Sequence, residues 1–132
     1  MISVVLRNKD EERWIGHAVQ SCIDHFKDPE IIVVDNHSTD KSMDIVKEFC
    51  FSDIKIHTID GYTPGKALNL GVSAASHENI LILSAHSQIT DMVGIEEVEA
   101  LLDEYAAVFG KQTPVYRGRK INKRYVWSHF AN

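Results

Sequence analysis

Four short apolar runs, separated by segments of helical periodicity, constrain the fold of this chain most strongly. They lie at Ser3–Leu6, Glu30–Asp35, Ile54–Ile59 and Asn79–Ser84. Their length and their content of Ile, Val and Leu are typical of strands, and the nearly continuous apolar runs are typical of strands buried on both faces. The alternation of such strands with helices predicts an α/β fold, a three-layer α/β/α sandwich around a mainly parallel sheet.

The segments between the runs place apolar residues three and four positions apart, which predicts helices with one apolar face. We expect these helices at Glu11–Phe26, Met43–Phe49, Lys66–Ala75 and Gly94–Phe109. The sequence after Lys111 is less regular. A chain of 132 residues suits one domain, with its core at residues 1–110 and an extension at residues 111–132.

Composition excludes several classes of protein. The formal net charge is -5, so the basic surface of a nucleic-acid-binding protein is missing. No apolar run is long enough to span a membrane. Cys22 and Cys50 fall in helical patterns and form no CxxC motif, which indicates buried, reduced thiols. We therefore expect a cytoplasmic protein, with attachment to the inner face of the membrane as the one exception.

Ligands of parallel sheets bind at the carboxyl ends of the strands. Asp35 ends a wholly apolar strand and is expected to accept hydrogen bonds from a base or a ribose. The residues that follow it, Ser38–Asp40, favour a helix cap and turn over contact with a ligand. Gly65 and Lys66 open a helix, which suits either a phosphate or an ordinary turn with a solvated lysine. His86 follows the last strand, where it could bind a metal or a diphosphate, although a lone loop histidine usually does neither.

Taken together, these segments resemble family 2 glycosyltransferases with the GT-A fold. Ser3–Glu12 occupies the place of the family's SVVIPTYNE, and Glu30–Asp40 closely matches EIIVVDDGSTD. Gly65–Gly71 corresponds to GKAxALNxG, and Ile80–Leu83 is the strand that leads into the family's DxD motif. Each motif is weak alone, but four motifs in the family's order make a strong joint signal.

The resemblance implies inverting transfer of a sugar from a nucleotide diphosphate donor to a hydroxyl acceptor, in bacterial-type surface polysaccharide or glycan synthesis. It implies that Asp35 holds the base, uracil or thymine, and that Ser84 and His86 face the ribose, the diphosphate and any metal. The nucleotide-sugar site carried over by this match comprises Leu6, Arg7, Asn8, Glu11, Asp35, Asn36, Lys66, Asn69, Ser84, Ala85 and His86.

The chain departs from the family at DxD, where it has Ser84-Ala85-His86. Both carboxylates are missing, so we expect weakened binding of Mn²⁺ or Mg²⁺. His86 is the candidate ligand, and an imidazole suits manganese better than magnesium, which prefers oxygen ligands. A protonated His86 could instead contact the phosphates without a metal.

The second departure is length, because the family continues into an acceptor-binding half that supplies an acidic general base. The chain stops at Asn132 and offers no candidate for this base, so its catalytic residues are unknown. A non-catalytic nucleotide-sugar-binding fragment is therefore the alternative function. A flavodoxin-like signalling domain would need acidic residues after the first strand, where Arg7, Asn8 and Lys9 stand.

The C-terminal segment mixes basic and aromatic residues. These are Tyr116, Arg117, Arg119, Lys120, Lys123, Arg124, Tyr125, Trp127 and Phe130. A solvated tail would not need so many aromatic residues, so we expect a contact surface. A homodimer is favoured over an anionic membrane surface as its partner.

Overall fold

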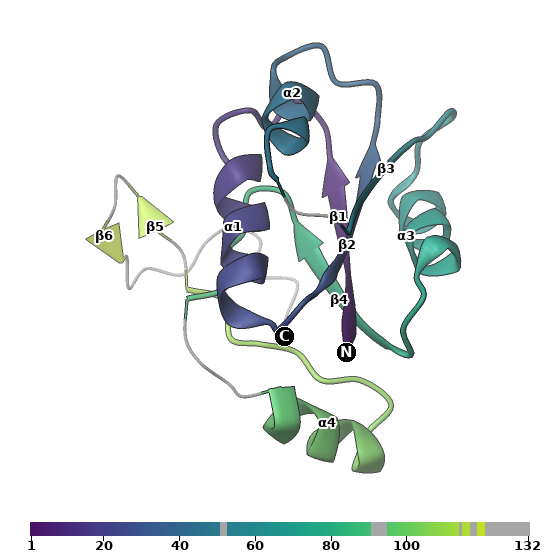
Figure 1. The fold of residues 1–132 in the computed structure, drawn as a ribbon, viewed down its shortest axis with the longest axis vertical. Coiled ribbons are helices and arrows are strands. Elements are labelled where there is room, and N and C mark those ends of the chain that lie inside the picture. The colour runs from purple at the N-terminus through teal and green to yellow at the C-terminus, as the bar shows by residue number, and fades with distance from the viewer. Residues whose placement is uncertain (51–52, 91–94, 114, 117–118, 121–132) are drawn as a thin grey trace, which may run out of the picture. The chain divides into compact units, whose positions relative to one another are not determined.

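The computed structural model describes residues 1–50, 53–90, 95–113, 115–116 and 119–120 (Figure 1). The chain divides into two compact units, Met1–Glu99 and Ala100–Asn132. The first unit holds a sheet of four parallel strands in the order β3-β2-β1-β4. The strands are β1 (Ile2–Asn8), β2 (Glu30–Asp35), β3 (Ile54–Thr58) and β4 (Asn79–Ser84). The predicted α/β fold with a parallel sheet is confirmed.

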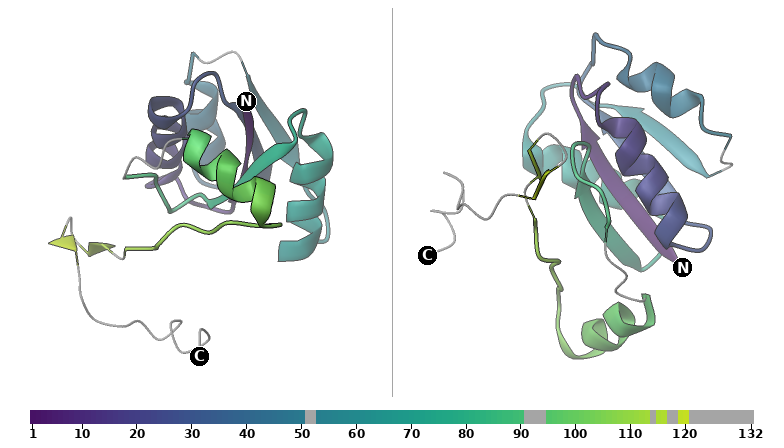
Figure 2. Two further views of the ribbon diagram at one scale, coloured as in Figure 1. Left: turned by 90° about the horizontal axis from the view of Figure 1, so that it is seen from below. Right: turned by 90° about the vertical axis from the view of Figure 1, so that its left-hand side faces the viewer.

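Helices cover both faces of this sheet. α1 (Ile15–His25) and α2 (Ser42–Lys47) lie on one face, and α3 (Pro64–Ala74) lies on the other. Figure 2 shows α1 and α3 on opposite sides of the strands in both views. This arrangement follows from the period of two along each strand, because alternate apolar residues point to opposite faces and each face needs a cover.

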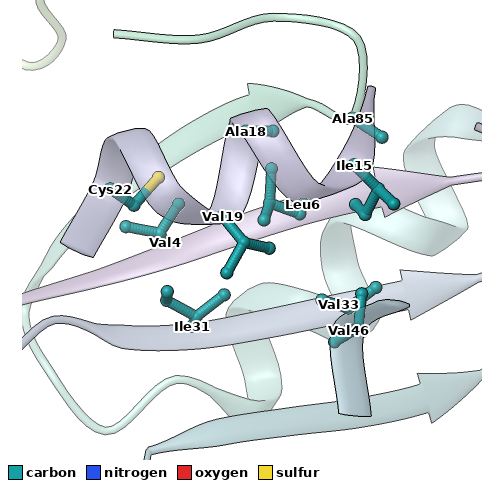
Figure 3. Packing of buried hydrophobic residues seen from close by; sticks show 10 residues of the cluster. All are labelled: Val4, Leu6, Ile15, Ala18, Val19, Cys22, Ile31, Val33, Val46 and Ala85. Carbon is teal, nitrogen blue, oxygen red and sulfur yellow. The ribbon is translucent and has the colours of Figure 1, made fainter. Parts of the chain in front are cut away.

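The core on the α1 side joins the two central strands to one stripe of the helix. Figure 3 shows these side chains meeting between α1 and the sheet. Every member is at most 1% exposed: Val4, Leu6, Ile15, Ala18, Val19, Cys22, Ile31, Val33, Val46 and Ala85. The α1 members recur three and four residues apart, as expected for a helix with one buried face.

α3 approaches the other face closely because it carries a glycine there. A Cβ at Gly71 would clash with the side chain of Val5 and lie 3.3 Å from Val34 Cγ2. The helix begins after Thr63, whose side chain accepts a hydrogen bond from Lys66 N at 3.2 Å. Pro64 at the first turn supports this start, because proline lacks the N–H that would be unpaired there.

Several boundaries differ from the sequence prediction. α1 begins at Ile15 rather than Glu11, since the preceding residues form a turn. α2 ends at Lys47, so the helical pattern does not reach Cys50, and the prediction that this thiol is buried is wrong. α4 spans only Ile95–Glu104, and none of its residues is buried.

Beyond α4, Val115–Tyr116 (β5) and Arg119–Lys120 (β6) form a short antiparallel pair. Most of the predicted C-terminal contact surface, residues 121–130 included, lies outside the described residues. Among the helices of the described part, none has the length and hydrophobicity that crossing a membrane requires.

Candidate functional site

The carboxyl ends of the strands bring the predicted site residues to one edge of the sheet. The register places Asn8 beside Asp35 and Arg7 beside Ser84. Because the strands are parallel, the loops after β1, β2 and β4 all leave from this edge. The side chain of Leu6 lies in the core beneath it, so this residue can reach a ligand only with its backbone.

Asp35 lies at the centre of a hydrogen-bond network. The side chain of Asn8 donates to Asp35 Oδ1 at 2.9 Å and to Ser38 Oγ at 3.0 Å. Ser38 donates to Asp35 twice, from its backbone N at 2.9 Å and from Oγ at 2.5 Å. Asp35 is 3% exposed and Asn8 is 1% exposed. The carboxylate is therefore fixed in orientation by neutral donors.

Asn8 also presents an unused acceptor. Its Oδ1 atom is buried and has no hydrogen-bond partner within the described residues. Buried polar atoms are rarely left unpaired, so each such atom needs an explanation.

The loop after β2 is bound to the loop after β1. Thr39 N donates to Asp10 Oδ1 at 2.7 Å, and Glu12 N donates to Asp40 Oδ2 at 2.8 Å. The pKa of Asp10 is lowered, chiefly by the Thr39 N–H. Burial acts to raise the pKa of Asp40, but hydrogen bonds from Ser42 and Glu12 outweigh it and lower that pKa. The polar residues Ser38–Asp40 therefore hold the loops after β1 and β2 together. Their interpretation as a cap and turn did not include this contact between the two loops.

His37 stands where the family motif has glycine. Its φ is 49°, in the left-handed region that glycine adopts most easily. The backbone O of His37 accepts from Lys9 Nζ at 2.7 Å, and its Nε2 lies 2.6 Å from Asp60 Oδ1. His37 thereby connects the loops after β1, β2 and β3. Sequence reasoning missed this contact, although the replaced glycine was a visible signal.

Lys66 and Asn69 lie apart from the Asp35 network. Lys66 is exposed, and its Nζ makes only a long contact of 3.5 Å to Gly61 O within the part of the chain that the structure describes. Asn69 is exposed on the same helix, α3. Arg7 reaches toward this side, with its Nη1 3.5 Å from Tyr62 Oη. The hydrogen bonds of the described residues do not join this group to Asp35.

The segment after β4 brings His86 to the loop after β1. Ala85 is buried and donates its N–H to Arg7 O at 3.3 Å, and a turn from Ser84 to Ser87 follows. His86 Nδ1 lies 3.2 Å from Glu11 Oε1. The described residues hold no group of three or more potential metal-ligating side chains. An imidazole beside a carboxylate nevertheless fits a metal that takes its other ligands from a bound diphosphate.

Comparison with known proteins agrees with this architecture. The family model for "Glycosyl transferase family 2" matches residues 3–131. A Methanococcus voltae protein, dolichyl N-acetyl-alpha-D-glucosaminyl phosphate 3-beta-D-2,3-diacetamido-2,3-dideoxy-beta-D-glucuronosyltransferase, is 31% identical over 93 residues. That match covers 65% of this chain and 29% of the relative.

Two solved structures show the same fold. Residues 1–349 of S. aureus TarS, in complex with UDP, match with a TM-score of 0.68 at 23% identity, over 86% of this chain and 38% of that one. Glucosyl-3-phosphoglycerate synthase from Mycobacterium tuberculosis, in complex with Mn²⁺, UDP and glucosyl-3-phosphoglycerate, has a TM-score of 0.53 at 24% identity. That match covers 67% of this chain and 35% of the synthase.

This chain therefore spans less than two fifths of each of these relatives. Its parallel sheet agrees with the GT-A fold of the glycosyltransferases that it resembles. The family model extends over nearly its whole length, and the chain belongs to glycosyl transferase family 2.

Proposed function

We propose that this chain binds a nucleotide diphosphate sugar, of the uridine or thymidine type, at the carboxyl edge of β1, β2 and β4. It then serves inverting transfer of the sugar to a hydroxyl acceptor, in surface polysaccharide or glycan synthesis. The observation that carries the proposal is the buried Asp35 carboxylate, held by Asn8 and Ser38 beside an unused acceptor. The UDP complex of TarS, whose fold this chain shares, supports it.

The chemistry of Asp35 favours uracil or thymine over cytosine. Uracil and thymine carry an N–H at ring position 3, which a carboxylate can accept, whereas cytosine presents an unprotonated nitrogen there. A site with a buried hydrogen-bonding group rejects the base that leaves the group unpaired.

The other proposed site residues serve the ribose, the diphosphate and the sugar. Arg7 and Lys66 supply positive charge, and Lys66 lies in the first turn of α3, where backbone N–H groups favour an anion. A divalent metal, when bound, neutralises charge on the leaving diphosphate. His86 is the ligand that would hold it. The rest of the proposed site comprises Leu6, Glu11, Asn36, Asn69, Ser84 and Ala85.

We assign donor binding to residues 1–110 and treat residues 111–132 as the start of an acceptor half or an extension. The alternative is a non-catalytic fragment that binds the nucleotide sugar only, because the sequence offers no candidate for the acidic general base that the family resemblance implies. Product analysis with a donor sugar, compared with donor binding, separates the two functions.

We propose the C-terminal basic and aromatic segment as a contact surface. A second copy of the chain is the preferred partner, and an anionic membrane is the alternative. Light scattering with and without residues 125–132 tests the dimer.

Calorimetric titration with UDP tests the donor site. Asp35→Asn keeps the size of the side chain but removes the carboxylate acceptor, and it should weaken UDP binding by about 10- to 100-fold, the effect of an unpaired buried group. The matched control is Asp24→Asn, an exposed substitution on α1 that should leave affinity unchanged. Circular dichroism verifies that both variants are folded. Unchanged affinity in folded Asp35→Asn would refute the site.

A further inference from the structure

Glu11 and His86 form a pair that crosses from the loop after β1 to the loop after β4. Glu11 Oε1 lies 3.2 Å from His86 Nδ1. The backbone of Glu11 is fixed, because its N–H donates to Ser42 Oγ at 2.9 Å and its carbonyl accepts from Ile15 N at 2.9 Å. The backbone before His86 is fixed by the buried Ala85. Both side chains therefore start from well-positioned backbone.

The partner of His86 determines which of its nitrogens is free. A carboxylate only accepts hydrogen bonds, so Glu11 requires a proton on Nδ1. In the neutral imidazole, the lone pair is then on Nε2. The side chain of His86 is 61% exposed, and Nε2 makes no hydrogen bond to the described residues. Metal-binding histidines are commonly held in this way, with a carboxylate on the other ring nitrogen.

We propose that Glu11 is a positioning residue that orients His86 to bind a divalent transition metal through Nε2, on a bound nucleoside diphosphate. This inference rests on the proposed function, because the bound diphosphate supplies the other ligands of the metal. Glu11 acts through His86 and does not touch the metal.

The arrangement predicts an unusual metal preference. Imidazole nitrogen favours later transition metals, and affinities generally rise from Mn²⁺ to Co²⁺. Mg²⁺ prefers oxygen ligands, whereas His86 offers it an imidazole nitrogen. UDP affinity should therefore increase most with Co²⁺, less with Mn²⁺ and least with Mg²⁺. The rival arrangement is a protonated His86 that contacts the phosphates with no metal.

The experiment is calorimetric titration of UDP in EDTA, Mg²⁺, Mn²⁺ or Co²⁺. We expect His86→Ala to abolish the gain in UDP affinity between EDTA and Co²⁺, with each variant compared with itself in EDTA. Glu11→Ala should reduce the metal-dependent gain by about 10- to 100-fold, the usual effect of losing such a partner, and Glu11→Gln should lie between. Glu12→Gln is the matched control, since the side chain of Glu12 accepts from Lys41 N and does not contact His86.

Two further measurements follow the metal ion and the imidazole proton directly. The chain has seven histidines, so a metal ion can also bind away from His86. The loss of the electron paramagnetic resonance signal of free Mn²⁺, measured with and without UDP, separates metal binding that needs the nucleotide from binding that does not. Nitrogen-15 spectra of the imidazoles should place the His86 proton on Nδ1 in the native chain and redistribute it in Glu11→Ala. A UDP affinity that is equal in EDTA and in Co²⁺, or a gain from Co²⁺ that is the same in Glu11→Ala as in the native chain, overturns the inference alone. Absence of UDP binding under every condition overturns the proposed function as well.

Discussion

Glu30 should contribute more to stability than any exposed carboxylate of the chain. It lies at the start of β2, at the edge of the sheet opposite the candidate site, and is fully buried. Its carboxylate accepts from Ser3 Oγ and forms an ion pair with Lys55. Ser76 donates to it from the backbone at 2.8 Å and from Oγ at 2.7 Å. Four donors thus join β1, β3 and the loop before β4 to one side chain.

The expected loss in the free energy of unfolding follows from the groups that lose a partner when Glu30 is replaced. Glu30→Ala leaves the buried O–H of Ser3 without its acceptor, at about 1–3 kcal/mol for such a group, although Ser3 Oγ still accepts from His77 N at 3.1 Å. Lys55 loses its counter-ion, but its side chain is 41% exposed and regains water, so the loss there is smaller than for a fully buried pair. We expect a total of about 3 kcal/mol for Glu30→Ala. Glu30→Gln keeps one acceptor and should lose about 2 kcal/mol.

The contribution of Glu30 should also depend on pH. Burial acts to raise its pKa, but hydrogen bonds from Lys55, Ser3 and Ser76 outweigh burial and lower the pKa far below the ordinary 4.5. A carboxylate whose folded pKa is depressed stabilises the fold above its unfolded pKa and loses this effect as pH falls toward the folded value. The difference between the native chain and Glu30→Gln should therefore be constant near neutral pH and shrink below about pH 4.5.

Urea unfolding followed by circular dichroism measures these differences. Glu78→Gln is the matched control, an exposed glutamate close to Ser76 in the sequence, and it should change the free energy of unfolding by less than about 0.5 kcal/mol. The reasoning is refuted if Glu30→Gln is as stable as the native chain at pH 7. It is equally refuted if the difference stays the same from pH 7 to pH 3.

Three further outcomes can be measured. Gly71→Ala should destabilise the fold by about 1–3 kcal/mol in urea unfolding, because the added methyl overpacks the contact between α3 and the sheet; Gly65→Ala, which meets no atom within 4 Å, should not. A thiol reagent should label Cys50 in the folded chain and Cys22 only after unfolding, because burial raises the pKa of Cys22 to about 12. Ser38→Ala should lower UDP affinity about tenfold in calorimetry, since it removes a donor that orients the proposed base-binding carboxylate; an unchanged affinity would separate this serine from the site.

The strands could be predicted well from the sequence. β2 and β4 have the expected bounds, Glu30–Asp35 and Asn79–Ser84, because each apolar run is flanked by polar residues. Helix ends were harder, because they depend on partners distant in the sequence. α1 starts four residues later than expected, where the preceding loop is tied to Asp40 and Ser42. A periodicity of three to four residues carries no information on such loop-to-loop contacts.

In the candidate site too, features set by the local sequence could be predicted, whereas contacts between distant residues could not. The position of Asp35 at a strand end could be predicted, because it depends only on the run before it. The contact between Glu11 and His86 could not, since 75 residues separate them and neither belongs to a shared periodic pattern. The burial of Glu30 was equally hidden, because its partners come from three separate segments.

The two buried carboxylates of β2 show how a structural acid differs from the proposed binding acid, Asp35. Glu30 and Asp35 occupy opposite ends of one strand, and both are at most 3% exposed. Glu30 has a cationic partner, Lys55, so its charge is compensated within the fold. Asp35 has no cationic partner among the described residues and is held by the neutral side chains of Asn8 and Ser38. Its charge is oriented but not neutralised, and a ligand with an N–H group at the carboxyl edge would complete the site.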